Sequence, residues 1–348
     1  MIALHDAARH VFASDNSSGV HPEVMAALSS ANGGHTDSYG GDPYTAAWEE
    51  RVRVLFGPDA STVAVLNGTG ANVLSLLAVT PRHGAVLCAP SAHINTDEAA
   101  APERAGLKLV TAQAGGDGKI TPAAVHSAAA SLGSQHHAQP LTVSLSNVTE
   151  VGTAYTAEET AAVAEAAHGH GMLLHVDGSR LSHAAAHLRT GLRELTTDAG
   201  VDILSLGATK NGALLAEAIV ALSPAAGRAL PLLRKGSLQL VSKARFVSAQ
   251  LLAMYGQDLW LRNAEHANTM ATRLADGLTA LPGVEAAYPV ESNAAFLTAP
   301  SRLVETLRER FVFHGAGTTA SPARLMCSFD TRESHVDELL DAARAAAR

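Results

Sequence analysis

Short apolar runs alternate with segments of helical spacing along the first two thirds of the chain. The apolar runs, rich in Val, Leu and Ile, lie at 62–68, 85–90, 108–113, 140–147, 172–178 and 201–210. Segments with helical spacing follow the first five, at 71–79, 95–106, 120–132, 156–171 and 179–188. Strands and helices that alternate in this way predict an α/β fold with a parallel sheet between two layers of helices. Functional groups are then expected at the carboxyl ends of the strands.

The pattern changes after about residue 245. Two long helical patterns occupy 247–281 and 334–347, and short strand candidates lie between them at 283–289, 294–299 and 323–330. This arrangement predicts a second, smaller α+β domain.

Composition and charge exclude several classes of protein. The 348 residues are 47% hydrophobic and 17% charged, with a mean hydropathy of +0.10, which is typical of a folded globular protein. A net charge of −8 and a pI of about 6.1 argue against a nucleic-acid-binding surface. The two cysteines, Cys88 and Cys327, lie among apolar residues, so we interpret them as reduced core residues.

The amino-terminal residues include the charged Asp6 and Arg9, where a signal peptide needs an unbroken apolar stretch. No uncharged apolar run reaches the length of a membrane span. We therefore expect a cytoplasmic protein with no membrane contact.

A glycine turn, "NGTGAN" at 67–72, follows the first predicted strand and begins a helix. The exposed N–H groups of such a helix start can hold a phosphate. The turn lacks the third glycine of a dinucleotide-binding motif, because Val73 stands there, and no Gly-Lys-Ser/Thr follows. A plain glycine turn is the alternative interpretation.

Two charged residues stand at the ends of successive predicted strands. Asp177, in "HVDGSR", ends one strand, and Lys210, in "LSLGATKNG", ends the next, 33 residues later (210 minus 177). This is the separation expected within one βαβ unit, so carboxylate and amine can lie near each other. Taken singly, Asp177 could be a helix cap and Lys210 a solvated strand end.

A phosphate-binding turn, a buried aspartate and a strand-end lysine together match the needs of pyridoxal 5′-phosphate (PLP). The cofactor requires an anion site, a partner for its pyridinium nitrogen and an amine that bonds to its aldehyde. The three features therefore predict a PLP site at the carboxyl edge of the sheet.

Seven motifs in order resemble the L-threonine aldolases, close to the low-specificity and phenylserine-cleaving branch. They are "FASDN", "YGGDP", "NGTGAN", "SAHINTDE", "HVDGSR", "TKNG" and "ARLMCSFD". The resemblance implies a PLP enzyme of fold type I, with a large domain built on a mostly parallel seven-stranded sheet and a smaller α+β domain. The implied boundaries are 1–15 for a segment that contributes to the active site, 16–248 for the large domain and 249–348 for the small one.

The resemblance also implies a role for each matching residue. Lys210 carries PLP through its amine, Asp177 pairs with the pyridine nitrogen, and His93 stacks on the cofactor ring. The residues implied for the phosphate are Gly68, Thr69 and Arg245. Those implied for the substrate α-carboxylate are Ser14, Arg180 and Arg324.

The chain departs from the family pattern at two places. "SNVTEVG" has Glu150 at or near the position where many relatives have a histidine, and Gly41 replaces an acidic residue in "YGGDP". The reaction that the resemblance implies needs a base that removes a proton from the β-hydroxyl group of the substrate. The candidates for this base are His93, Glu150 and a water held near Glu98.

The implied reaction is the reversible cleavage of an L-β-hydroxy-α-amino acid to glycine and an aldehyde. The resemblance also implies a homotetramer, a dimer of dimers with active sites at the dimer interface, in which Tyr39 is a candidate cross-subunit residue. Three alternatives remain: a β-eliminating PLP lyase, a metal site at His168, His170 and His175, and a catalytically silent binding protein on the same fold. No H-E-x-x-H or paired C-x-x-C supports the metal site, and the presence of Lys210 disfavours the silent protein.

Overall fold

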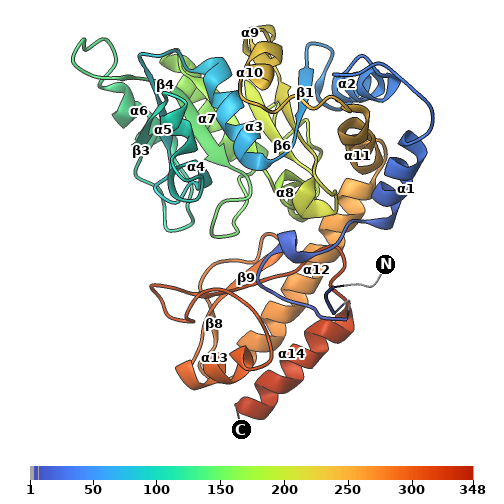
Figure 1. Ribbon diagram of the computed structural model, residues 1–348. Helices are drawn as coiled ribbons and strands as arrows, with labels where there is room; N and C mark the ends of the chain where they lie inside the picture. Colours follow the sequence, from blue (N-terminus) through green and yellow to red (C-terminus); the bar gives the residue numbers. More distant parts are fainter. Residues whose placement is uncertain (1–3, 7, 348) are drawn as a thin grey trace.

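A computed structural model of the chain describes residues 4–6 and 8–347 (Figure 1). Its larger sheet has seven strands, and β2 to β6 run parallel to their neighbours of that group. In spatial order the strands are β1 (Ser61–Val65), β7 (Glu217–Ala221), β6 (Ile203–Gly207), β5 (Leu173–Gly178), β4 (Gln139–Ser146), β2 (Gly84–Cys88) and β3 (Lys108–Thr111). The mostly parallel sheet and the six predicted strands are thus confirmed.

The sequence pattern missed β7, which runs antiparallel to both of its neighbours, β1 and β6. Its five residues are all buried. Residues 218–222 form an apolar run of the kind that identifies a buried strand, so the sequence did carry a signal for β7. Its Glu217 lies opposite Gly207, beside the turn that carries Lys210.

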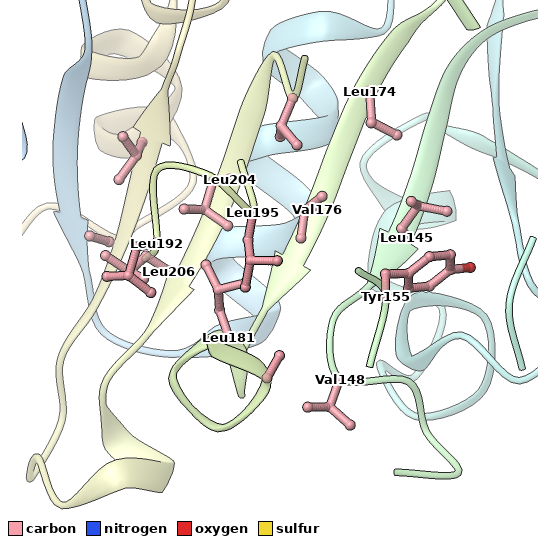
Figure 2. Close-up of a cluster of buried hydrophobic side chains, with 14 of the residues drawn as sticks. Leu145, Val148, Tyr155, Leu174, Val176, Leu181, Leu192, Leu195, Leu204 and Leu206 are labelled. Carbon is pink, nitrogen blue, oxygen red and sulfur yellow. The ribbon is translucent and has the colours of Figure 1, made fainter. Parts of the chain in front are cut away.

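Helices cover both faces of this sheet. They are α1 (Pro22–Ala31), α2 (Pro43–Phe56), α3 (Gly68–Val79), α4 (His93–Thr96), α5 (Ala101–Arg104), α6 (Pro122–Ala129), α7 (Ala157–Gly169), α8 (Leu181–Leu188), α9 (Pro224–Gly227), α10 (Leu230–Gly236) and α11 (Arg245–Tyr255). Consecutive residues of β7 pack in different hydrophobic clusters. Ile219 belongs to a cluster with residues of α3 and α10, and Val220 to a cluster with residues of α2 and α11. Figure 2 shows part of the larger core, where Leu145, Val176 and Leu204 project from three neighbouring strands.

Side-chain caps begin several of these helices. Asp42, Asn67, Thr121 and Thr156 each accept a hydrogen bond from an N–H in the first turn of α2, α3, α6 and α7. Each cap satisfies a donor that has no partner inside the helix. Thr121 caps the start of α6 within the segment 120–132, where a helix was predicted.

The single helix predicted over 95–106 is wrong. The segment forms two short helices, α4 and α5, separated by Ala99 and Ala100, which have φ angles of 49° and 57°. The carboxylate of Glu98 turns inward to bond Asn72 and His93, and these contacts fix the chain where alanine-rich sequence favours a helix.

The carboxyl-terminal third forms a second core around a three-stranded antiparallel sheet. Its strands lie in the order β10 (Ala323–Met326), β9 (Ala294–Thr298) and β8 (Glu285–Ala286). Its helices are α12 (Leu259–Thr279), α13 (Ser301–Arg308) and α14 (Glu333–Ala346). Phe12, from the amino-terminal segment, is buried in this second core. The two free cysteines are also buried, Cys88 in the first core and Cys327 in the second, as predicted.

The boundary predicted at residue 248 falls inside α11. Val247, Leu251 and Met254 of this helix all pack in the first core. We propose that the division between the two domains lies after Tyr255, where α11 ends. Across residues 4–6 and 8–347, no helix combines the length and the apolar character required to cross a membrane.

Candidate active site

A cavity of about 580 Å³ lies where the carboxyl ends of β4 to β6 meet β9 and β10. Six of the site residues predicted from the sequence line this cavity: Ser14, His93, Glu150, Arg180, Lys210 and Arg324. A larger groove of about 1280 Å³ between α8 and α12 contains none of them. The smaller cavity is therefore the candidate active site.

Lys210 lies in a 3-10 turn, η2 (Thr209–Asn211), directly after β6. β5 and β6 are adjacent and parallel, so Lys210 and Asp177 follow neighbouring strand ends, as predicted. The positive charge of Arg180 and burial lower the pKa of the Lys210 amine. Gly207 is required just before this turn, because a Cβ there would lie 2.6 Å from the Ser179 carbonyl oxygen.

Glu217 supports the Lys210 turn from β7. Its carboxylate accepts hydrogen bonds from the backbone N–H groups of Ala208 (3.1 Å) and Thr209 (3.3 Å). Burial raises the pKa of Glu217 to about 7. Glu217 was not predicted as a site residue, because its strand was not recognised.

Asp177 is buried at the end of β5. It accepts from Ser179 N (3.0 Å), Ser179 Oγ (2.6 Å) and Asn72 Nδ2 (2.8 Å). Burial alone would raise its pKa, but the charge of Lys210 and these hydrogen bonds lower it, so the carboxylate stays ionised. The cap position of α8 is Arg180, so Asp177 does not cap that helix.

A hydrogen-bonded chain links Asp177 to His93. Asn72 Nδ2 also donates to Glu98 Oε1 (2.9 Å), and the same oxygen lies 2.9 Å from His93 Nδ1. The hydrogen bond to Glu98 raises the pKa of His93. Asn72 was not nominated from the sequence, although it ends the motif "NGTGAN".

Glu150 holds His93 from the other side. Its Oε1 accepts from the backbone N–H of His93 (2.9 Å) and from Ser146 Oγ (2.6 Å). Burial raises the pKa of Glu150 despite these hydrogen bonds. His93 and Glu150, two candidates for the base, thus belong to one cluster with Glu98, the residue near which the third candidate, a water, was expected.

The residues nominated for the substrate carboxylate lie together in the same cavity. Arg180 forms an ion pair with the buried Asp15, and Arg324 Nη2 donates to the Ala13 carbonyl (3.0 Å). Ser14 lies between these two contacts in the chain and lines the cavity. Asp15 was not nominated, although "FASDN" contains it.

The glycine turn begins α3 at Gly68, with Asn67 as its cap. Asn67 Oδ1 accepts from Gly70 N (2.8 Å). In the described part of the chain, the N–H groups of Gly68 and Thr69 have no hydrogen-bond partner. A Cβ at Gly68 would lie 3.8 Å from Ser179 Oγ, so this helix start is beside the Asp177 turn.

Arg245 and Tyr39 lie apart from the cavity and from the other predicted site residues. Arg245 Nη1 donates to the Gly34 carbonyl (3.2 Å), in a separate hollow of about 300 Å³. Tyr39 is 52% exposed, with Lys235 Nζ 5.3 Å from the centre of its ring. Within one copy of the chain, neither residue is brought to the other site residues.

The three histidines of the metal alternative lie in three separate settings. His168 pairs with Asp202, His170 bonds His126, and His175 is buried between Ser144 and Ser205. Over residues 4–6 and 8–347, no three His, Cys, Asp or Glu side chains gather as metal ligands would.

The amino-acid sequence is similar to known proteins over most of its length. The family model described as beta-eliminating lyase matches residues 12–300. The low specificity L-threonine aldolase of Pseudomonas sp. (strain NCIMB 10558) is 40% identical over 340 residues, covering 96% of this chain and 97% of the relative. The Pseudomonas aeruginosa protein of the same name is 40% identical over 334 residues, covering 94% and 95%.

Solved structures agree with the sequence relatives. The threonine aldolase of Leishmania major superposes with a TM-score of 0.92 at 28% identity, covering 98% of this chain and all 100% of that one. The serine palmitoyltransferase of Sphingomonas wittichii has a TM-score of 0.71 at 16% identity, with 98% and 88% covered, and shows a shared fold alone. The predicted fold type I architecture is confirmed.

Proposed function

This chain belongs to the beta-eliminating lyase family, and from that premise we propose that it is a PLP-dependent lyase that cleaves L-threonine, L-allo-threonine and related β-hydroxy-α-amino acids. The products are glycine and an aldehyde. The observation that carries this proposal is the position of Lys210, in a cavity that also holds Arg180 and Arg324 and beside the ionised Asp177.

The residues of the cavity fit PLP. The lowered pKa of Lys210 favours the neutral amine that can bond to an aldehyde. The unpartnered N–H groups of Gly68 and Thr69 suit a phosphate, and Asp177 suits a pyridinium nitrogen. Two buried oxygens at this site, Asn72 Oδ1 and Glu98 Oε2, lack a partner among the described residues. When bound, PLP supplies a ring that accepts the electrons of the broken bond.

Substrate orientation is the task of Arg180, Arg324 and Ser14. Two guanidinium groups that hold one carboxylate fix the substrate about Cα, and this fixed geometry decides which bond of Cα breaks. We assign the cleavage of the Cα–Cβ bond to this constraint.

His93 is our candidate for the base that removes the β-hydroxyl proton. Glu98 occupies Nδ1 of its ring, and within the described residues Nε2 has no protein partner. Glu98 is buried, and Glu150 Oε1 is already bonded by Ser146 and by the backbone of His93. Both carboxylates therefore orient His93, and the hydrogen bond from Glu98 raises the affinity of the imidazole for a proton.

We further propose a cytoplasmic homotetramer whose sites form between subunits. Arg245 and Tyr39 lie outside the cavity of their own chain, and Tyr39 is exposed. A second copy could bring Arg245 toward the phosphate, which would reconcile its position with the role that the sequence suggested. Sedimentation of the PLP-loaded protein gives the number of subunits.

The test of function is an assay of products. PLP-loaded protein is supplied with L-threonine, L-allo-threonine and L-phenylserine, and glycine and aldehyde are measured. We expect equimolar glycine and aldehyde. Ammonia with a 2-oxo acid would instead identify the β-eliminating alternative, and activity that is lost with a chelator would support a metal enzyme.

A further inference from the structure

Two residues of the amino-terminal segment, Ala13 and Asp15, hold the two arginines of the cavity. The Ala13 carbonyl accepts from Arg324 Nη2 at 3.0 Å, and the Asp15 carboxylate pairs with Arg180. Ser14, between them, lines the cavity itself. The segment therefore bridges the arginine that follows β5 and the arginine on β10.

The Asp15–Arg180 pair is bidentate. Arg180 Nε donates to Oδ2 at 2.7 Å and Nη2 donates to Oδ1 at 2.9 Å. Nη2 also lies 3.4 Å from Met326 Sδ. Only Nη1 of Arg180 has no partner in the described part of the chain, so this nitrogen is left to bind an anion from the cavity.

Asp15 is itself held in place. Its side chain is 0% exposed, and Asn293 Nδ2 donates to Oδ2 at 3.0 Å. Burial opposes ionisation, but the charge and hydrogen bonds of Arg180 lower the pKa of Asp15 to about 2, with help from Lys210 and His183. The carboxylate therefore stays charged throughout the range in which proteins function.

The segment is anchored to the second core. Phe12 N donates to the Val312 carbonyl, and Met326 N donates to the Phe12 carbonyl, at 2.9 and 2.8 Å. Phe12 is buried among the apolar residues of that core. Arg180 itself follows a strand of the larger sheet. Through its ion pair with Arg180, Asp15 therefore connects the second core to the larger domain.

Charge gives Asp15 a second effect. Arg180 and Arg324 repel each other, and this repulsion contributes with burial to a lowered pKa of Arg324. Without Asp15, the two guanidinium groups would lack the buried anion that keeps them at a fixed separation.

We propose that Asp15 is a positioning residue for the substrate carboxylate: it fixes two nitrogens of Arg180 so that Nη1 is presented to the cavity. The inference rests on the proposed binding of that carboxylate by Arg180. Asp15 itself does not touch the substrate. Its removal should weaken binding of amino acids that carry a carboxylate and spare amines that lack one.

The test compares glycine with glycinamide as ligands of the PLP-loaded protein, with dissociation constants taken from the change in visible absorbance. For Asp15→Asn we expect glycine to bind about 10- to 100-fold more weakly and glycinamide to change less than about twofold. In an Arg180→Ala background, Asp15→Asn should add less than about twofold. Asp42→Asn is the control, because Asp42 is also a buried aspartate but caps α2 away from the cavity.

The possible results separate the two proposals. If Arg180→Ala leaves glycine binding unchanged, the proposed carboxylate site is wrong. If Arg180→Ala weakens glycine binding but Asp15→Asn does not, or if the two effects add fully, only the role of Asp15 is overturned. Should Asp15→Asn not fold, Asp15→Glu keeps the charge and displaces Arg180 by one methylene. A wild-type ratio of glycine to glycinamide affinity in Asp15→Glu would overturn the inference.

Discussion

The two walls of the cavity are built in different ways. The strand-end wall is lined by Lys210, with Asp177 and Glu217 behind it on adjacent strands of one sheet. The amino-terminal wall is lined by Ser14 and Arg324, with Asp15 behind them, and it joins residues far apart in the chain, as in the contact between Arg324 and Ala13 across 311 positions. The first wall carries the groups assigned to chemistry, and the second carries groups assigned to binding.

Substitutions in the two walls are therefore expected to have different effects on activity. Loss of Lys210 from the strand-end wall should abolish reaction with every substrate, because the same lysine serves them all. A change in the amino-terminal wall should affect ligands according to whether they carry a carboxylate. Substitutions of Lys210 and Arg324 test that division, and substitutions of Glu217 and Glu98 test groups that hold neighbouring site residues in place.

Lys210→Ala should have the largest effect. We expect turnover of L-threonine to fall by about 10³-fold or more, because no other group in the cavity can bond to the cofactor. Steady-state assays of aldehyde release measure the effect, with the exposed Lys108→Ala as the matched control. Retained turnover in Lys210→Ala would remove the strand-end wall from the chemistry.

Glu217→Gln should change how stability depends on pH. Because burial raises the folded pKa of Glu217 from 4.5 to about 7, its contribution to stability is present at acidic pH and is lost as pH rises through about 7. Wild type should therefore lose about 3 kcal/mol between pH 4.5 and pH 8 from this group, and Glu217→Gln should not. Urea unfolding at several pH values measures the difference, with the exposed Glu285→Gln as control. Parallel pH profiles for Glu217→Gln and wild type would contradict this assignment.

Arg324→Ala tests the amino-terminal wall. We expect the KM for L-threonine to rise about 10- to 100-fold with a smaller change in kcat, because one charged partner of the carboxylate is lost. Arg302→Ala, an exposed arginine on α13, is the control. A fall in kcat at unchanged KM would mean that Arg324 serves the chemistry and that the two walls are not distinct.

Glu98→Gln should have the smallest effect. Its loss lowers the pKa of His93, which the Glu98 hydrogen bond raises, so the acidic limb of kcat/KM should move to lower pH. At pH values above that limb, we expect kcat/KM to change by less than about tenfold. A limb that stays in place would point to a base other than His93.

The walls also differ in how far sequence alone could predict them. Asp177 and Lys210 were predicted because buried strands with a charged last residue can be read from the local pattern. Glu217 was missed because the apolar run that follows it, residues 218–222, was not assigned to a strand. Arg180 and Arg324 were assigned only through resemblance, and Asp15 and Asn293 escaped notice, because a partner 278 positions away leaves no local signal.

The most direct test of the central claim is a map of where PLP attaches. PLP-loaded protein is reduced with borohydride, which makes the link between cofactor and protein permanent, and the digested peptides are analysed by mass spectrometry. The account predicts that the cofactor is found on Lys210 and on no other lysine. Attachment at another lysine, or recovery of an unmodified peptide containing Lys210, would contradict it.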